Sequence, residues 1–350
     1  MTFKSVAVKT GIAAIALTSL GLVAAVPASA HTNNMYTLVA WHGEAETIGF
    51  ATYSKTDGTA AFIGETYPSQ MMYIAGIEIA NEKGTVLGHA GDSDYVQEWD
   101  HKTGATSSEA VPLSLNIPGE ERDYFYQEYV GLDTLNDGTT VTVIGYETDV
   151  AEGQVEKHFA IASVNSTNGQ LTPLVDITLA IMNGDAVLVY EPTSLATDPT
   201  TGLTYVFLED QERKARFLEV DVAAGTVSTS TLFGGPFYVE GAIDAADFEV
   251  DGTMFVNYLD YTEEEQQLEL LRLGAPSTWA TADPTFISLA PAQSPDTGIF
   301  DHALTIEHTA LAATGSELPI AALVFGGALA VMFGGVTVVV ARRRSEAGTI

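Results

Sequence analysis

The chain contains no cysteine, which excludes a disulfide framework, a cysteine-ligated zinc or iron–sulfur site and a thiol nucleophile. Basic residues are scarce: 14 Lys and Arg stand against 46 Asp and Glu, a formal net charge of −32 over 350 residues. Nucleic acids and anionic membrane surfaces bind proteins through Lys and Arg, so neither is an expected partner. Long amphipathic helical patterns and Gly/Ser linkers are also scarce, which favours a single β-rich domain between the two ends of the chain.

The N-terminal residues 1–30 have the pattern of a secretory signal peptide. Lys4 and Lys9 precede an apolar stretch at residues 12–26, and Ala28-Ser29-Ala30 matches a cleavage site. We expect signal peptidase to cut after Ala30, so that the mature chain starts at His31. The alternative is an uncleaved N-terminal anchor.

A second apolar segment lies near the C-terminus. Residues 318–341 are 24 residues without a charge, and at about 1.5 Å per residue a helix of this length spans a bilayer with some tilt. Three arginines follow at 342–344 and open a basic tail, 342–350, which we expect to lie in the cytoplasm. The residues before the span are then extracellular.

A short motif, Leu311-Ala312-Ala313-Thr314-Gly315, precedes the apolar span. This order of pentapeptide, apolar span and basic tail resembles the cell-wall sorting signal of Gram-positive surface proteins. The resemblance implies that sortase cleaves between Thr314 and Gly315 and joins the Thr314 carboxyl group to peptidoglycan. The usual motif has Pro where this chain has Ala312, and the Leu-Ala-x-Thr-Gly form resembles a variant of high-GC Gram-positive bacteria. The departure leaves the sortase class open, and a permanent membrane anchor is the alternative.

The extracellular part is more acidic than the whole chain. Five of the 14 basic and two of the 46 acidic residues lie outside residues 31–314, which leaves 9 basic and 44 acidic residues, a net charge of −35. A solvated acidic surface explains this charge, and cation binding is the alternative. No complete calcium loop and no paired-histidine metal motif is present, so we predict no metal site and no cofactor, with loosely bound calcium left open.

A repeat organises residues 31–310. A short strand, a turn ending in Gly and a second β-rich strand recur, with the turn glycines at 84, 138, 202 and 252. Glycine suits a tight hairpin turn because it reaches positive φ without a Cβ clash. The first strands of the units are predicted at residues 74–79, 132–135, 195–197 and 246–250. The fourth strands are predicted at 111–115, 171–177, 227–233 and 286–289.

The two ends of this region complete the repeat. The N-terminal part supplies three strands, 35–41, 48–53 and 60–64, and the C-terminal part supplies one, 303–307. Together they make a fifth four-stranded unit in which both termini pair, which closes a ring and protects its sheet edges. We therefore predict a five-bladed β-propeller over residues 31–310, with a β-sandwich as the alternative.

Aromatic and acidic residues gather where one predicted blade crosses to the next. The crossings share one face of a propeller with the loops between second and third strands, and those loops are acidic here. Aromatic faces with carboxylates suit sugar rings and cationic groups. The candidate ligand-binding residues are Tyr67, Tyr73, Tyr124, Tyr126, Tyr190, Phe237, Tyr238, Glu240 and Asp301. The alternative is that these aromatics belong to the core between blades.

Evidence for catalysis is weak. No nucleophile elbow and no P-loop is present. Asp133 and Asp247 both lie five residues before a turn glycine, whereas the other two units have Ile79 and Thr197 at that offset. Some five-bladed glycosidases carry carboxylates at the channel mouth, so these two are the candidate catalytic residues, although no glycosidase motif surrounds them. We predict a surface protein that binds an extracellular glycan or protein, with a glycoside hydrolase or a passive wall protein as alternatives.

Overall fold

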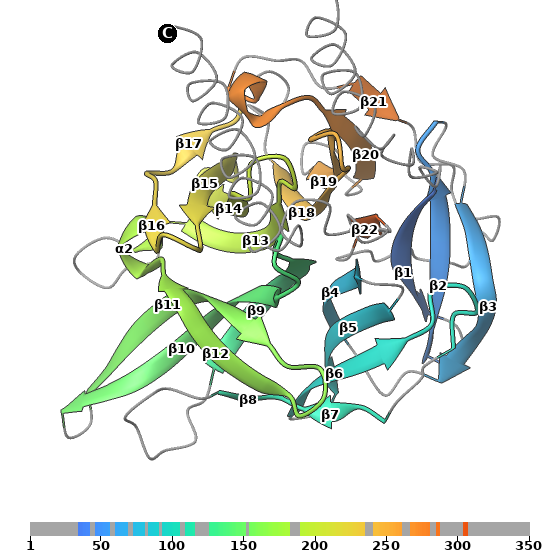
Figure 1. Ribbon diagram of the computed structural model, residues 1–350, viewed down its shortest axis with the longest axis horizontal. Coiled ribbons are helices and arrows are strands. Elements are labelled where there is room, and N and C mark those ends of the chain that lie inside the picture. The colour runs from blue at the N-terminus through green and yellow to red at the C-terminus, as the bar shows by residue number, and fades with distance from the viewer. Residues whose placement is uncertain are drawn as a thin grey trace, which may run out of the picture. The chain divides into compact units, whose positions relative to one another are not determined.

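The computed structural model describes residues 34–42, 46–56, 60–68, 73–80, 83–90, 93–105, 109–115, 126–151, 154–182, 190–234, 241–260, 267–280, 285–287 and 304–306. Their strands form five sheets of four or five strands each, arranged around a common centre (Figure 1). The innermost strands touch in a closed circle, β22 to β4, β4 to β9, β9 to β13, β13 to β18 and β18 back to β22. The predicted five-bladed β-propeller is confirmed.

Blade 1 joins the two ends of the domain. It is built from β22 (Leu304–Ile306), β1 (Asn34–His42), β2 (Glu46–Ser54) and β3 (Ala60–Pro68) in that order. The C-terminal strand β22 pairs antiparallel with β1, from Met35 opposite Ile306 to Thr37 opposite Leu304. The chain therefore closes its own ring, as the sequence predicted.

Blades 2 and 3 follow along the chain. Blade 2 contains β4 (Tyr73–Ala80), β5 (Lys83–Ala90), β6 (Ser93–Trp99) and β7 (Val111–Pro112). Blade 3 contains β9 (Tyr126–Thr134), β10 (Thr140–Ala151), β11 (Gln154–Val164), β12 (Gln170–Asp176) and β8 (Ser114–Leu115). The short helix α2 (Thr178–Ile181) comes directly after β12.

The single strand predicted at 111–115 is wrong, because this segment is shared by two blades. β7 pairs with β6 of blade 2, and β8 pairs in parallel with β12 of blade 3. At the switch, the Leu113 amide donates to the Asp94 carbonyl of blade 2 at 2.8 Å, and the Ser114 amide donates to the Gly169 carbonyl of blade 3 at 2.9 Å. The segment thus ties the two blades together at their outer edge.

Blades 4 and 5 complete the ring. Blade 4 contains β13 (Tyr190–Thr197), β14 (Thr204–Asp210), β15 (Ala215–Asp221), β16 (Thr226–Val227) and β17 (Thr231–Leu232). Blade 5 contains β18 (Gly241–Phe248), β19 (Met254–Asp260), β20 (Gln267–Leu273), the 3₁₀ turn η2 (Pro276–Thr278) and β21 (Thr285–Ile287). The predicted strand 227–233 is interrupted, because β16 and β17 pair separately with β15.

The turn glycines behave as predicted at three of the four first turns. Gly138, Gly202 and Gly252 have positive φ, between 75° and 88°, which a side chain with a Cβ adopts only with strain. Gly84 is different: it lies within β5, and the strand register runs on to Ala80 opposite Lys83. A Cβ on Gly84 would lie 2.3 Å from the Trp99 ring, so this glycine is needed for close packing rather than for the turn.

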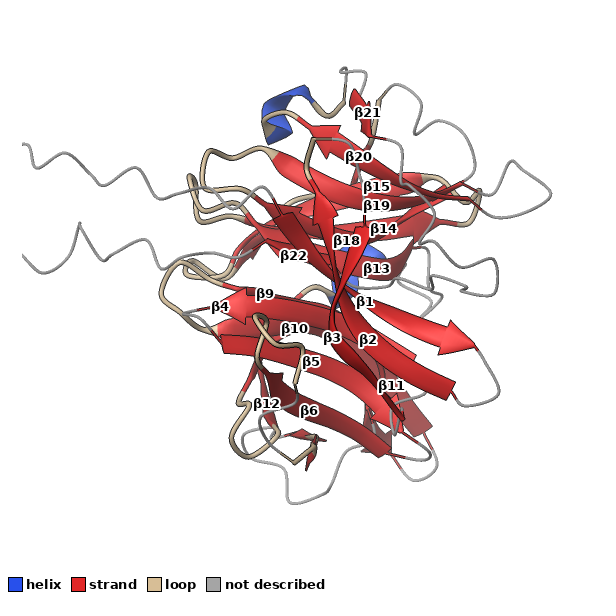
Figure 2. Ribbon diagram, turned by 90° about the vertical axis from the view of Figure 1, so that its right-hand side faces the viewer, coloured by secondary structure: helices blue, strands red, loops and turns tan. Residues whose placement is uncertain are grey.

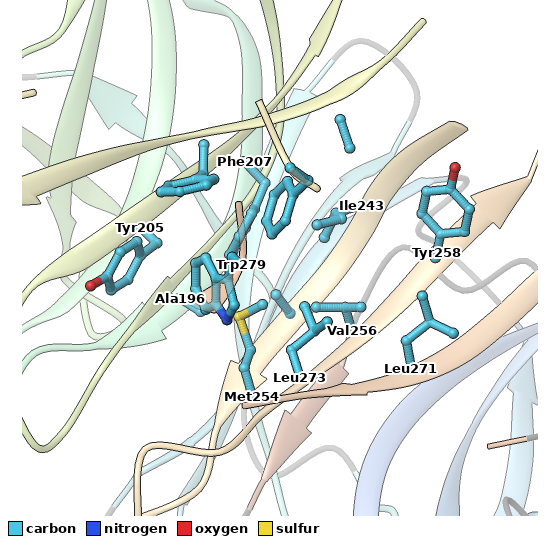
Figure 3. Close-up of a cluster of buried hydrophobic side chains, with 14 of the residues drawn as sticks. Ala196, Tyr205, Phe207, Ile243, Met254, Val256, Tyr258, Leu271, Leu273 and Trp279 are labelled. Carbon is cyan, nitrogen blue, oxygen red and sulfur yellow. The ribbon is translucent and has the colours of Figure 1, made fainter. Parts of the chain in front are cut away.

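Aromatic side chains fill the space between neighbouring blades. Trp279, just after η2, is 1% exposed and lies 4.9 Å from the Tyr205 ring and 5.4 Å from the Phe233 ring, centroid to centroid, both in blade 4 (Figure 3). Its Nε1 donates to the Gly274 carbonyl at 2.7 Å. Trp99 at the end of β6 stacks on Phe50 of blade 1 with ring centroids 3.8 Å apart. Such contacts bury large apolar areas between sheets that share no backbone ladder.

Strands are the main element of the described residues, where helix is confined to α2 and η2 (Figure 2). Among the described residues, neither helical segment has the length and apolar character needed to cross a bilayer. By compactness the chain divides into residues 1–308 and 309–350, and all described residues belong to the first unit. The predicted signal peptide with Ala30, the motif at 311–315 and the apolar span at 318–341 lie outside the described residues.

Candidate functional site

Three candidate tyrosines are the first residues of inner strands. Tyr73, Tyr126 and Tyr190 begin β4, β9 and β13, where the chain enters blades 2, 3 and 4. Tyr67 lies near the end of β3. The side chains of Tyr67, Tyr73 and Tyr126 are outside the described part, whereas that of Tyr190 is described and half-buried. The remaining candidates, Tyr124, Phe237, Tyr238, Glu240 and Asp301, lie outside the described residues.

The Tyr190 ring is fixed by charged neighbours on the β14–β15 hairpin. The Arg216 guanidinium carbon lies 5.3 Å from the ring centroid, and Arg216 Nε donates to Asp210 Oδ2 at 2.8 Å. Burial by itself would raise the pKa of the Asp210 carboxyl group. The Arg216 hydrogen bond and the amides of Lys214 and Glu212 outweigh burial and hold that pKa below its ordinary value. Asp210 therefore stays ionised and keeps the guanidinium over the ring.

A groove of about 670 Å³ opens beside Tyr190, between blades 3 and 4. Blade 3 contributes the end of β12 and helix α2, and blade 4 contributes Tyr190 and the outer segment 227–230. Its walls are apolar at Ile177, Leu179, Ala180 and Val227. They are polar at Asp176, Ser228, Thr229 and Ser230. This mixture of apolar walls with a few polar groups is typical of ligand sites.

Local hydrogen bonds shape the blade 3 wall of the groove. Asp176 Oδ1 accepts from the Thr178 amide at 2.8 Å, which bends the chain out of β12 and starts α2. Thr178 Oγ1 accepts from the Phe159 amide at 2.9 Å and ties this turn back to β11. Ile181 packs into the core with 0% exposure. Leu179, on the other side of this short helix, points away from the core and is 93% exposed.

The candidate catalytic residues Asp133 and Asp247 are each 2% exposed. Both carboxylate oxygens of each residue accept hydrogen bonds from backbone amides. Asp247 Oδ1 accepts from the Phe248 amide at 2.6 Å and Oδ2 from the Ile306 amide of β22 at 2.5 Å. Asp133 Oδ1 accepts from the Thr134 amide at 2.6 Å, and Oδ2 accepts from the Thr197 amide of β13. Each carboxylate thus links its own inner strand to that of the next blade, which favours a structural role.

Thr305 of β22 makes the corresponding link between blades 1 and 2. Its Oγ1 accepts from the Ile79 amide at 3.2 Å and donates to Glu78 Oε2 at 3.1 Å. Together, Thr305, Asp133 and Asp247 accept five amides, one from each inner strand. These are the amides of Ile79, Thr134, Thr197, Phe248 and Ile306. We name these three acceptors the closure belt.

The blade equivalences predicted for Ile79 and Thr197 are wrong by one residue. In the closure belt, the amides of Ile79 and Thr197 are bound in the same way as those of Thr134 and Phe248, which directly follow the two aspartates. The residues before Ile79 and Thr197, which are Glu78 and Ala196, are therefore the equivalents of the aspartates. For Ile79, the reason is that Gly84 lies within β5, beyond the turn that joins Ala80 to Lys83. For Thr197, the reason is turn length. The Asp198 amide bonds to the Leu203 carbonyl, which spans one residue more than Leu135 to Thr139 or Glu249 to Thr253.

The five inner strands pack closely together at the centre of the ring where Gly131, Leu195 and Leu304 lie. A cavity of about 10 Å³ there is lined by all five inner strands, through residues such as Gly131, Leu195 and Leu304. This volume holds about one water molecule at most. In the described part of the chain, no three His, Asp or Glu side chains are grouped so that they could hold a metal ion.

Comparison with known proteins identifies no family for this chain. No family model matches the chain, and no curated protein matches its sequence. A crystal structure of a protein of unknown function from Dyadobacter fermentans has 10% identity and a TM-score of 0.44, covering 74% of this chain and 84% of that one. A candidate 6-phosphogluconolactonase from Bacteroides uniformis has 12% identity and a TM-score of 0.40, covering 73% and 82%.

The structure of the Dos1 propeller has 12% identity and a TM-score of 0.33, covering 73% of this chain and 58% of that one. Likenesses this distant carry no argument about activity. The strand pairing itself defines the class: this chain contains a five-bladed β-propeller.

Proposed function

We propose that this chain is an exported surface protein whose propeller binds an extracellular ligand, a glycan or a protein. The observation that carries the proposal is the groove beside Tyr190, which combines an aromatic ring, the exposed Leu179 and polar groups at a blade crossing. Support for export comes from the pattern of residues 1–30, and support for anchoring from residues 311–344. The anchor would hold the propeller at the wall or membrane of a Gram-positive bacterium, with signal peptidase and sortase as processing partners.

The test is a binding screen with a purified fragment of residues 31–310, which holds all five sheets. A glycan array and a set of extracellular matrix proteins are probed in calcium and in chelator. We expect saturable binding that Tyr190→Leu weakens about tenfold, because leucine keeps the apolar contact with the core but removes the ring. Tyr95→Leu on blade 2 is the matched control. A wild-type fragment that binds nothing in the screen would favour the passive wall protein instead.

A further inference from the structure

Leu179 is a large apolar side chain that lies almost wholly in solvent. At 93% exposure it is, with Leu174 at 43%, one of two exposed large hydrophobic residues in the described part of the chain. Leu179 lines the groove and Leu174 does not. An apolar group of a bound molecule that packs on Leu179 would remove this side chain from water, which is favourable by the hydrophobic effect.

The other wall of the groove offers backbone groups. Ser228 remains attached to β15, because its amide donates to the Glu219 carbonyl at 2.9 Å and its Oγ accepts from the Glu219 amide at 2.9 Å. The next two amides, of Thr229 and Ser230, donate no hydrogen bond to any other described residue. They lie between β16 and β17, where the outer strand is interrupted. An extended peptide can satisfy such groups by adding to a sheet edge.

Charge favours a basic occupant. Asp176 lines the groove, and Glu191 and Glu219 are exposed on the neighbouring strands of blade 4. Arg216, the cation over the Tyr190 ring, is paired with Asp210 at 2.8 Å. The field over residues 31–314, with a net charge of −35, attracts cations and repels acidic glycans.

We propose that the groove between blades 3 and 4 binds an extended basic peptide segment of a partner protein. An apolar residue of the segment packs on Leu179, its backbone follows Thr229 and Ser230, and a Lys or Arg lies near Asp176. This inference rests on the proposed function and narrows its ligand from glycan or protein to a protein of stated chemistry.

The test measures binding of two labelled seven-residue peptides to residues 31–310, by fluorescence anisotropy. One peptide alternates Lys and Leu, and the other alternates Glu and Leu. We expect only the Lys/Leu peptide to bind. Leu179→Ser should raise its Kd about tenfold or more, and Asp176→Asn should raise it about two- to fivefold. Binding should weaken further at high salt.

Leu174→Ser is the matched control, because it also removes an exposed leucine from blade 3 but lies outside the groove. It should change the Kd less than twofold. Equal Kd values for Leu179→Ser, Leu174→Ser and wild type would show unspecific attraction to the acidic surface and overturn the proposal. A glycan hit in the screen above that is sensitive to Leu179→Ser, without peptide binding, would also overturn it but leave the proposed function standing.

Discussion

Asp133 and Asp247 are carboxylates that each accept two backbone amides, one from their own strand and one from the next blade. Buried amides without an acceptor are costly, and inner strands of different blades share no ladder that could supply one. Two aspartates and one threonine supply the acceptors for all five blades. The closure belt therefore accounts for the burial of these two carboxylates.

The belt gives a prediction about stability. Asp247→Ala removes the acceptor of both the Phe248 and the Ile306 amides, and we expect it to lower the free energy of unfolding by about 2–5 kcal/mol. Asp247→Asn should cost less, because its amide oxygen still accepts one hydrogen bond. Urea unfolding of residues 31–310 measures the difference.

Asp251→Ala in the exposed turn of the same blade is the control, with an expected loss of about 1 kcal/mol or less. Unchanged stability of Asp247→Ala, together with loss of a measured glycosidase activity, would contradict the structural role. It would return Asp247 to the list of catalytic candidates.

The sequence placed both aspartates at one blade position correctly but could not identify their partners. Counting back from a turn glycine assumes turns of equal length, and blade 4 has one residue more. Ala196 therefore takes the position that the count assigned to Thr197. Which amide a carboxylate accepts depends on the neighbouring blade, and a single-sequence pattern holds no information on that contact.

The sequence predicted the strands that flank short turns well, and it predicted the outermost strands of the blades less well. Inner strands follow from the turns and from buried apolar runs, whereas the outer strands β7, β8, β16 and β17 have only two residues each. The segment 111–115 pairs with two blades. The segment 227–233 is interrupted after Val227, where the Ser228 hydroxyl accepts from the Glu219 amide in place of a strand carbonyl. The groove arises from this break and from α2, so no strand pattern could reveal it.

Trp279 anchors blade 5 against blade 4, although it lies in a segment with no strand of its own. Trp279→Ala would leave a cavity among Tyr205, Phe217 and Phe233, and we expect a loss of about 3–5 kcal/mol in the free energy of unfolding. Trp279→Phe should recover part of this loss because it refills part of the space. Thermal unfolding followed by near-ultraviolet circular dichroism reports both variants.

Leu174→Ala, an exposed residue on β12, should change stability by about 0.5 kcal/mol or less and is the reference for that experiment. Equal stabilities of Trp279→Ala and Leu174→Ala would show that the ring contributes nothing to the contact between the blades.

At the scale of the whole molecule, the proposed wall attachment depends on Thr314. We expect Thr314→Ala to move the protein out of the covalently bound, detergent-resistant wall fraction and into the membrane or the medium. Sortase would lack the Thr–Gly bond that the sorting-signal resemblance implies. Fractionation and immunoblotting of cells that express the full chain measure this shift.

Ser316→Ala, one residue beyond the motif, is the matched control and should leave the wall fraction unchanged. Retention of Thr314→Ala in the wall at the wild-type level would refute sortase attachment. It would leave the apolar span as a membrane anchor.

The three-residue strand β22 closes the ring, and it is the last strand of the propeller before the C-terminal segment. Its hydrogen bonds to β1 run across the strands, so a pull on the C-terminus along β22 loads them together in shear rather than one after another. Asp247 adds a lateral hold on Ile306, and Leu304 and Ile306 are 3% and 4% exposed. Under the proposed C-terminal attachment to the wall, a pull on a ligand bound to the propeller would load this pair of strands, and their strength would set the force at which the propeller opens.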